Sequence, residues 1–330
     1  MQAVVAVDGG GSKTDIAILD VAGHVLARTR QGAFAEHVIG RRKTVKSLDG
    51  VIAQLLSGID DVQVVSTSVC FSDIDFPFQV EACEKQLRAC AWGQQHLFVD
   101  NDTFALLRAG TDEQTAVAVV CGTGMNCVGR TTDGRTARFA AIGDVSGDWG
   151  GGGGLGSEAI WHSARAADGR GPATILESLV LRQLGQDSMS DLIIAFYKGK
   201  LHSDAVPLLA PLVFEAAVAG DQVAGGLVQR QADEIVALTT AALRRLDILG
   251  QPCPVVLGGG VIAGRHKCLL DAIDAGLAQR APGTYAVIVT DPPIVGAALL
   301  AFDALGVDHD VQQCVRRSLE TAVSPQAALA

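Results

Sequence analysis

The feature that most constrains the fold is an internal repeat of an apolar run followed by a glycine-rich turn. An apolar run at 4–7 leads into three consecutive glycines, and a second run at 117–120 leads into a Cys-Gly-Thr-Gly turn at 121–124. Aligning Val7 with Val120 superposes the glycines of the two turns. Two copies of one α/β unit imply a pseudo-twofold pair with a cleft between them. The sequence therefore predicts a duplicated α/β fold.

Apolar periodicity predicts the elements of both copies. In the first copy we expect strands at 4–7, 16–18, 25–27, 62–69 and 97–99, and helices at 44–57, 79–91 and 103–108. In the second we expect strands at 117–120, 125–128 and 254–257, a helical insertion at about 157–250, and helices at 261–277 and 293–305. These elements predict one domain at 1–112 and another at 113–305. The segment 306–330 is expected to pack back on the first domain or to fray.

The composition disfavours several classes of partner. The chain has 26 basic and 36 acidic residues, a net charge of −10, which disfavours nucleic acid. It contains no run of 18 uncharged apolar residues and no basic leader, so we expect a cytoplasmic protein without a membrane partner. The eight cysteines form no CxxC pair, and most are expected to be buried thiols.

The first glycine turn predicts an anion site. Glycines between two strands let backbone amides face a phosphate without side chains in the way. A P-loop is disfavoured because the residues after Lys13-Thr14 are strand-like rather than helical. A turn with no ligand is the remaining alternative. Asp8 favours the functional interpretation, because a carboxylate at the end of an interior strand beside such a loop can hold Mg²⁺ through water.

Two further glycine turns fit the same scheme. The hairpin Gly122-Thr123-Gly124 is weak evidence alone, but it matches the first hairpin in the repeat, and two such hairpins facing across a cleft could grip a triphosphate. Gly258-Gly259-Gly260 fits a dinucleotide-binding pattern, but no acid follows at the expected distance. In a duplicated fold this turn would instead lie against adenosine.

Two acidic segments are candidates for chemistry at the acceptor. Asn101-Asp102 follows an apolar strand, where a carboxylate can accept a hydroxyl proton; a helix N-cap is the alternative. Asp148-Trp149 precedes five glycines, which predicts close approach to a ligand, with a mobile lid as the competing interpretation. His37 and His162 are better explained as surface or capping residues than as catalytic ones.

Taken together, these segments resemble the BadF/BadG/BcrA/BcrD ATPases, and within them the N-acetylglucosamine kinase-like sugar kinases of the actin-like ATPase superfamily. The motifs that carry the resemblance are VAVDGGGSKTD at 5–15, NDTFAL at 101–106, CGTGMNC at 121–127, GDWGGGG at 147–153, VLGGGV at 256–261 and PPIVGAA at 292–298. The resemblance covers residues 3–305. It implies two ribonuclease H-like domains that close over ATP–Mg²⁺ and a sugar.

The resemblance also implies a role for each motif. Asp8 would serve the metal, Asp102 would be the catalytic base, and Asn101 would contact the acceptor. The phosphates would be bound by Gly10, Gly11, Ser12, Lys13, Thr14, Gly122, Thr123 and Gly124, and the adenosine by Gly258, Gly259 and Gly260. Asp148, Trp149, Gly150, Glu36 and His37 would line the sugar site. The reaction would be in-line transfer of the γ-phosphoryl group of ATP to an amino sugar, at its 6-hydroxyl, and a homodimer is possible.

The sequence departs from the family pattern in two places. Residues 35–40 lack an Asn that usually contacts a sugar hydroxyl, and residues 154–156 lack a common acid. Glu36 could face an ammonium group and favour glucosamine, with a solvated loop carboxylate as the alternative.

Two other functions stay open. One is an ATPase that activates an iron–sulfur partner, for which no suitably placed cysteine pair is evident. The other is a sugar-sensing protein that binds without reacting.

Overall fold

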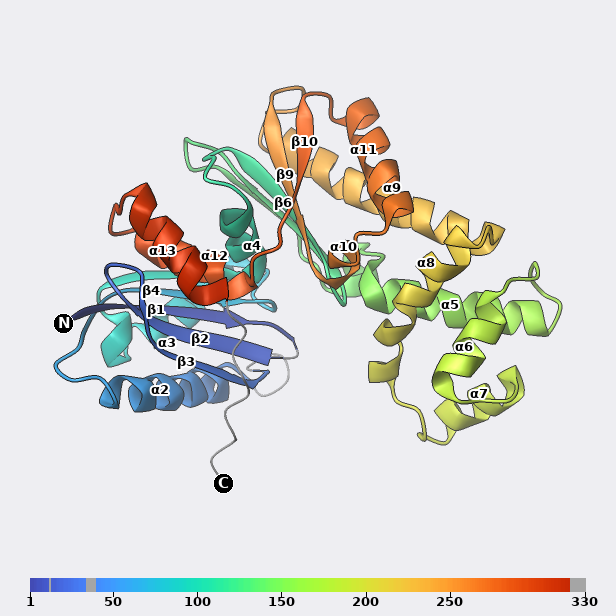
Figure 1. Cartoon of the computed structure of the whole chain (residues 1–330), viewed down its shortest axis with the longest axis horizontal. Coiled ribbons are helices and arrows are strands. Elements are labelled where there is room, and N and C mark those ends of the chain that lie inside the picture. The colour runs from blue at the N-terminus through green and yellow to red at the C-terminus, as the bar shows by residue number, and fades with distance from the viewer. Residues whose placement is uncertain (12, 34–39, 321–330) are drawn as a thin grey trace. The chain divides into compact units, whose positions relative to one another are not determined.

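The computed structural model describes residues 1–11, 13–33 and 40–320. It divides the chain into two compact units. Unit 1 comprises Met1–Glu113 together with the C-terminal segment from Val289 onward, and unit 2 comprises Gln114–Ile288. Each unit contains one five-stranded mixed sheet (Figure 1).

The sheet of unit 1 has the strand order β3-β2-β1-β4-β5. Its strands are β1 (Gln2–Gly9), β2 (Lys13–Asp20), β3 (Val25–Gly32), β4 (Gln63–Phe71) and β5 (His96–Asn101). The first three form an antiparallel meander, and β4 and β5 continue the sheet in parallel on the other side of β1. β1 is buried from Ala3 onward because helices cover both faces of the sheet.

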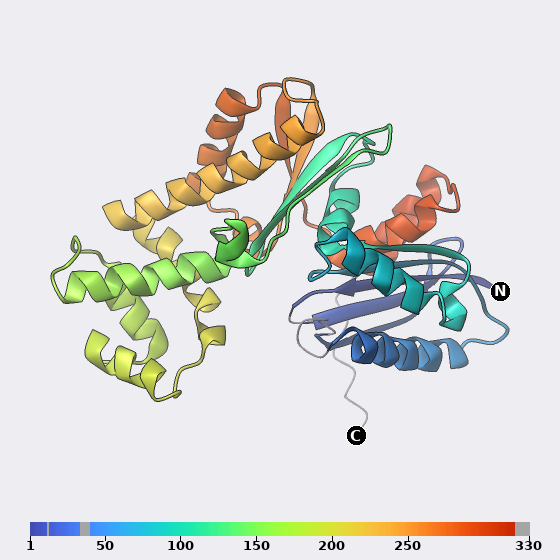
Figure 2. The same ribbon diagram turned by 180° about the vertical axis from the view of Figure 1, so that it is seen from behind.

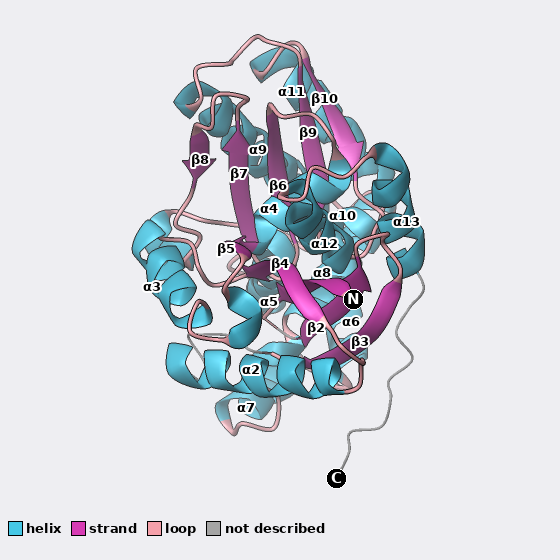
Figure 3. Ribbon diagram, turned by 90° about the vertical axis from the view of Figure 1, so that its left-hand side faces the viewer, coloured by secondary structure: helices cyan, strands magenta, loops and turns pink. Residues whose placement is uncertain are grey.

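Helices cover the two faces of this sheet in separate layers (Figure 3). One layer consists of α2 (Arg41–Ser57), α3 (Pro77–Leu87) and the short η1 (Ala91–Gly93), whose buried side chains pack on Val5, Val7 and Ile16. The other layer is formed by α4 (Asp102–Gly110), α12 (Pro293–Asp303) and α13 (His309–Glu320). Because side chains alternate along β1, the residue after Val7 projects toward the layer of α4 and α12.

The C-terminal boundary differs from the one predicted, because α12 belongs to unit 1 and not to the second domain. A Cβ at Gly296 of α12 would lie 1.8 Å from the backbone oxygen of Ala105 in α4, so only glycine allows this close helix contact. The buried Arg108 guanidinium binds both carboxylate oxygens of Asp303 at 2.8 and 3.0 Å. Arg316 of α13 donates to the carbonyl of Ala109 at 2.9 Å. The apolar run at 293–305 indicated a helix but could not indicate its partner.

The sheet of unit 2 repeats the topology of unit 1. Its strands are β6 (Ala116–Cys121), β7 (Met125–Arg130), β8 (Thr136–Arg138), β9 (Cys253–Gly258) and β10 (Thr284–Ile288). Read from β8, the order is β8-β7-β6-β9-β10, with three antiparallel strands followed by two parallel ones. The predicted duplication of an α/β unit is therefore present, while β8 and β10 were not predicted.

Unit 2 also carries the helices drawn from green to orange in Figure 2. They are α5 (Gly151–Ala167), α6 (Leu176–Leu184), α7 (Met189–Tyr197), α8 (Ala210–Val218), α9 (Gln222–Arg245), α10 (Gly260–Ala263) and α11 (Lys267–Arg280). The short η2 (Gly143–Ser146) precedes α5, and η3 (Ser203–Ala205) and η4 (Pro207–Leu209) lie between α7 and α8. Buried residues of α9 pack on Val117, Val119 and Cys121 of β6. The helix expected at 261–277 is interrupted after α10.

In the part of the chain that the structure describes, no single helix is both long and apolar enough to cross a bilayer. One pair of helical segments, Ser203–Val218 and Gln222–Arg245, meets the length and composition criteria together but bends by 116° at the break.

Candidate functional site

Asp8 is a buried carboxylate near the end of β1, with 6% of its surface exposed. It lies directly opposite Asp15 of β2 in the antiparallel register. Burial, followed by the nearby Asp102 and Asp15 carboxylates, raises the pKa of Asp8 from 3.8 to about 8, although Lys13 and Arg30 partly offset this effect. The Asp15 carboxylate is neutralised by a two-point ion pair with Arg30, at 2.7 and 2.9 Å. Asp8 therefore lies in a site that favours a cation.

Asn101 and Asp102 have different roles at the start of α4. Asn101 is the N-cap: its side-chain oxygen accepts the N–H of Thr103 at 2.9 Å, and its side-chain nitrogen donates to Asp75 at 2.9 Å. The capping role considered for Asp102 thus belongs to its neighbour. Burial and the Asp73 carboxylate raise the pKa of Asp102 from 3.8 to about 7. A partly exposed carboxyl group with this pKa can exchange a proton near neutral pH.

Different constraints act on the three glycines of the first hairpin. A Cβ at Gly9 would lie 2.3 Å from the Phe71 ring, so packing requires glycine there. The N–H of Gly10 closes the turn by donating to the carbonyl of Lys13 at 2.8 Å. A Cβ at Gly11 would meet open space, so packing does not explain this glycine. Ser12, assigned to the phosphates, lies outside the described residues.

The second hairpin joins β6 and β7 through residues 122–124. A Cβ at Gly122 or at Gly124 would meet no atom within 4 Å, and neither residue has a positive φ. Neither packing nor backbone conformation therefore requires glycine at these two positions. Close approach of a ligand to the backbone is a reason that remains.

The glycine run after Trp149, for which close ligand approach and a mobile lid were the two interpretations, forms the beginning of helix α5. Gly150 and Gly151 have φ of 113° and 68°, which favour glycine. A Cβ at Gly151 would lie 2.6 Å from the carbonyl oxygen of Gly124. The N–H groups of Gly152 and Gly153 donate to the hairpin carbonyls of residues 122 and 123, at 2.7 and 2.8 Å. The hairpin thus satisfies donors that a helix N-terminus leaves free, and it explains the run better than a lid does.

The turn 258–260 packs against the other side of this hairpin. Gly259 has a φ of 92°, and a Cβ there would lie 2.4 Å from the carbonyl group of Cys121. The turn and the hairpin line one cavity of about 400 Å³ within unit 2. Its wall also contains Phe214, whose ring stacks on His266 with centroids 3.9 Å apart and planes within 3°. The structure thus brings together the predicted phosphate hairpin and the predicted adenosine turn.

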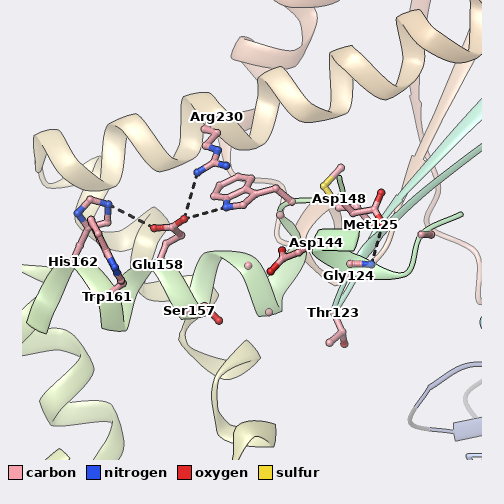
Figure 4. A pocket seen from close by; sticks show the side chains of 16 residues that line it. Thr123, Gly124, Met125, Asp144, Asp148, Ser157, Glu158, Trp161, His162 and Arg230 are labelled. Atoms are coloured by element: carbon pink, nitrogen blue, oxygen red, sulfur yellow. Dashed lines mark hydrogen bonds and ion pairs between the residues drawn. The ribbon is translucent and has the colours of Figure 1, made fainter. Parts of the chain in front are cut away.

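A second cavity, of about 820 Å³, lies on another side of the α5 N-terminus and is lined by Thr123, Gly124, Asp148, Trp149 and Gly150 (Figure 4). Glu158 of α5 joins its other polar side chains. The Glu158 carboxylate accepts the indole N–H of Trp149 at 3.1 Å and pairs with Arg230 of α9 at 3.4 Å and with His162 at 3.8 Å. The Arg230 guanidinium lies 3.8 Å from the centre of the Trp149 ring, so one face of this indole is covered.

Several of the predicted site residues lie close together within each unit. Unit 1 groups Asp8 with Asp102, and unit 2 groups the hairpin 122–124 with the turn 258–260 and with Trp149. Glu36 and His37 lie outside the described residues. Sequence reasoning missed the cavity-lining residues Met125, Glu158, Trp161, Arg230, Pro207, Pro211, Phe214 and His266, and it did not place His162 in a site. Of these residues, only Glu158, Trp161 and His162 could have been found from the sequence, because they follow the glycine run at helical spacing.

The described ranges contain no group of three or more His, Cys, Asp or Glu residues arranged to hold a metal ion. Mg²⁺ does not need such a cage, because it is commonly held by one or two carboxylates, waters and substrate phosphates. All eight cysteines are free thiols. Burial raises the pKa of Cys121 to about 12 and that of Cys127 still further, which disfavours the thiolate form that metal ligation requires.

The chain thus has a duplicated α/β fold, with a buried carboxylate near the end of its first strand and a glycine hairpin in each unit. Its fold matches a ROK family glucokinase from Streptomyces griseus, solved with glucose and AMPPNP, with a TM-score of 0.55 and 16% identity over 91% of this chain and 99% of that one. The chain belongs to the BadF/BadG/BcrA/BcrD ATPase family, whose model matches residues 5–301.

Curated relatives extend over nearly the whole chain. An N-acetyl-D-glucosamine kinase from Dictyostelium discoideum is 27% identical over 91% of this chain and 98% of its own length. An N-acetylmuramic acid/N-acetylglucosamine kinase from Clostridium acetobutylicum is 26% identical over the same shares. A Chromobacterium violaceum structure, described as that of a candidate N-acetylglucosamine kinase, has a TM-score of 0.68 and 25% identity, over 91% of this chain and 99% of that chain.

Proposed function

We propose that this chain is an ATP-dependent sugar kinase that transfers the γ-phosphoryl group to the 6-hydroxyl of an amino sugar such as N-acetylglucosamine or glucosamine. The observation that carries the proposal is the pair of interacting carboxylates Asp8, near the end of β1, and Asp102, the residue directly after β5. One would serve the metal and the other the acceptor hydroxyl. The kinase names of the two curated relatives support this assignment.

The nucleotide site would use backbone groups of both hairpins. Gly10, Gly11, Ser12, Lys13 and Thr14 would face the phosphates from unit 1, and Gly122, Thr123 and Gly124 would face them from unit 2. In support, glycine at 11, 122 and 124 has no packing cause. The adenosine would occupy the 400 Å³ cavity beside Gly258, Gly259 and Gly260, where Phe214 and His266 provide an aromatic wall. The cleft between the units that the repeat predicts remains part of this proposal.

The chemistry of Asp8 fits a magnesium ion. A buried carboxylate whose pKa is raised by burial and two other carboxylates gains most from a nearby cation. Asp8 would hold the ion, which supplies charge neutralisation of the phosphates when it is bound. Asp15 is not free for this task, because Arg30 already binds both of its carboxylate oxygens.

Asp102 would act as the general base. Its pKa of about 7 leaves a large fraction ionised at neutral pH, so it can take the proton of the attacking hydroxyl. The neighbouring Asn101 holds the first turn of α4 in place through its cap and its bond to Asp75, which orients Asp102. In-line attack by the oriented hydroxyl then depends chiefly on positioning and charge neutralisation.

The acceptor site would include Asp148, Trp149 and Gly150 of the 820 Å³ cavity. Glu36 and His37 are proposed acceptor contacts as well, and Glu36 would favour the ammonium group of glucosamine. If so, a Glu36→Gln variant should lower turnover of glucosamine relative to that of glucose. Equal effects on the two sugars would remove Glu36 from the acceptor site. The cytoplasmic location and the homodimer remain predictions.

The direct test is sugar-dependent ADP release with Mg²⁺–ATP over a panel of N-acetylglucosamine, glucosamine, N-acetylmannosamine, N-acetylmuramic acid and glucose. We expect turnover of at least one amino sugar and loss of it in the Asp102→Asn variant. A 6-deoxy analogue of the best acceptor should bind but release no ADP. Binding of a sugar without any ADP release would favour the sugar-sensing alternative, and an oxygen-sensitive brown protein would favour the activator.

A further inference from the structure

A buried glutamine connects the hairpin 122–124 with the helix that begins beside it. Gln231 of α9 is completely buried. Its side-chain oxygen accepts the N–H of Gly151, the first residue of α5, at 2.9 Å. Its side-chain nitrogen donates to the sulfur of Met125, the first residue of β7, at 3.0 Å. One amide group thus contacts both ends of the junction between hairpin and helix.

This junction leaves little freedom for either partner. The N–H groups of Gly152 and Gly153 bind carbonyls of the hairpin, and Gly151 packs on the Gly124 carbonyl so closely that no Cβ fits. Gln231 supplies the acceptor for the remaining N–H at the start of the helix, which no hairpin carbonyl accepts. Removing this acceptor would leave the buried Gly151 N–H with only the Cys121 sulfur, a weaker acceptor than an amide oxygen, which favours displacement of the first turn of α5.

The junction also separates the two cavities of unit 2. Gly152 lines the cavity proposed for adenosine, whereas Gly150 and Gly153 line the larger cavity proposed for the acceptor. Thr123 lines both cavities. A shift of the first turn of α5 would therefore change the hairpin where it faces the phosphates.

We propose that Gln231 is a positioning residue, which holds the hairpin 122–124 in its phosphate-binding arrangement by bridging Gly151 and Met125. The proposal rests on the assignment of this hairpin to a nucleotide in the preceding section. Gln231 itself lines neither cavity and would act only through the backbone that it holds. It would affect nucleotide affinity more than the stability of the fold.

The test compares Gln231→Leu with a matched control on the same helix, Thr239→Val. Thr239 is also fully buried and polar, but its hydroxyl bonds only to the carbonyl of Ile235 one turn away. We expect Gln231→Leu to raise the dissociation constant of Mg²⁺–AMPPNP and the KM for ATP about tenfold, since the buried Gly151 N–H loses its oxygen acceptor. Thr239→Val should leave both unchanged at a similar melting temperature.

Two further variants keep the test informative if Gln231→Leu does not fold. Met125→Leu preserves the bond to Gly151 and should raise the dissociation constant less than Gln231→Leu. Gln231→Glu should approach wild-type affinity at pH 5, where a protonated carboxyl group both donates and accepts, and fall away from it at pH 8, each measured against wild type at that pH. Equal affinities of wild type and Gln231→Leu for AMPPNP, or equal losses in Gln231→Leu and Thr239→Val, would overturn the proposal.

This experiment distinguishes a failure of the proposed kinase activity from a failure of the role proposed for Gln231. Nucleotide binding is measured without a sugar, so a wild-type protein that binds Mg²⁺–AMPPNP but phosphorylates no sugar would refute the proposed kinase activity and still test Gln231. A wild-type protein that does not bind Mg²⁺–AMPPNP would refute the role of Gln231.

Discussion

Replacing Asp8 with Asn should stabilise the ligand-free protein while it abolishes turnover. The folded protein holds the Asp8 proton with a pKa of about 8, whereas the unfolded chain releases it with the ordinary value of 3.8. Because the folded state binds more protons between these two values, the free energy of unfolding falls as pH rises through that range. Asparagine has no ionisable proton and escapes this loss. The stabilisation should therefore be small near pH 4 and grow up to about pH 8.

The size of the effect follows from the pKa difference. At about 1.4 kcal/mol per unit, the loss at pH 7 is at most about 4 kcal/mol, and at pH 5 about 1.5 kcal/mol. Interaction with Asp102, which also titrates near neutral pH, reduces these values. We expect the free energy of unfolding to be larger for Asp8→Asn than for wild type. This advantage should be roughly 1–2 kcal/mol greater at pH 7 than at pH 5.

Thermal melting of EDTA-treated protein at pH 5, 6, 7 and 8 measures this difference. Asp15→Asn is the matched control, since Asp15 faces Asp8 across the strands but forms an ion pair with Arg30, so its loss should lower stability at pH 7. Saturating Mg²⁺–ATP should raise the melting temperature of wild type more than that of Asp8→Asn. A gap between Asp8→Asn and wild type that stays constant from pH 5 to pH 8 would refute the reasoning, because it would show that Asp8 is not held protonated.

Four further outcomes test the site. Asp102→Asn should lower kcat with the sugar by about 10²–10⁴-fold with little change in Mg²⁺–AMPPNP affinity, and full turnover would exclude Asp102 as the base. In wild type, kcat/KM for the sugar should fall as pH drops through about 7, and Asp73→Asn should move this limb to lower pH because the Asp73 carboxylate raises the pKa of Asp102; an unmoved limb would assign it to another group. Gly122→Ala should raise the KM for ATP while the melting temperature stays within about 2 °C of wild type, since its Cβ meets open space. Gly151→Ala should instead destabilise unit 2 by roughly 2–4 kcal/mol, because of its positive φ and the carbonyl 2.6 Å away, and a wild-type melting curve would contradict the close helix–hairpin packing.

Local patterns were sufficient to predict the repeated part of the fold. Strands β1, β6 and β9 are short apolar runs next to glycine turns, so their existence and order follow from the sequence. The edge strand β10 was missed because its residues are only partly buried and do not alternate clearly between polar and apolar. Helix α12 was assigned to the wrong domain for a different reason, because the sequence of an apolar helix does not indicate which sheet the helix covers.

The glycine run at 150–154 could not be interpreted from local propensity. Consecutive glycines disfavour a helix by about 1 kcal/mol each relative to alanine, so local propensity does not predict a helix there. In the structure the hairpin carbonyls and Gln231 bind the first N–H groups of the run, and the backbone approach excludes side chains. Gln231 and Arg230 lie far away along the sequence, and no pattern connects them with this segment. Tertiary contacts thus decided both its conformation and its role.

The two repeats have diverged in a way that suits one nucleotide better than two. In unit 1, Asp8 of β1 lies opposite Asp15 of β2. The residue of unit 2 that is equivalent to Asp8 is Cys121, which lies opposite Met125. Burial keeps the Cys121 thiol neutral by raising its pKa to about 12, so the second hairpin would bring backbone groups to the proposed phosphates without adding a negative charge. A carboxylate in both copies would repel the phosphates twice, while a single one can be neutralised by the cation it holds. If this division of labour is correct, Cys121→Asp should weaken Mg²⁺–AMPPNP binding more than Cys121→Ser does, and equal affinities in the two variants would show that charge at this position is irrelevant.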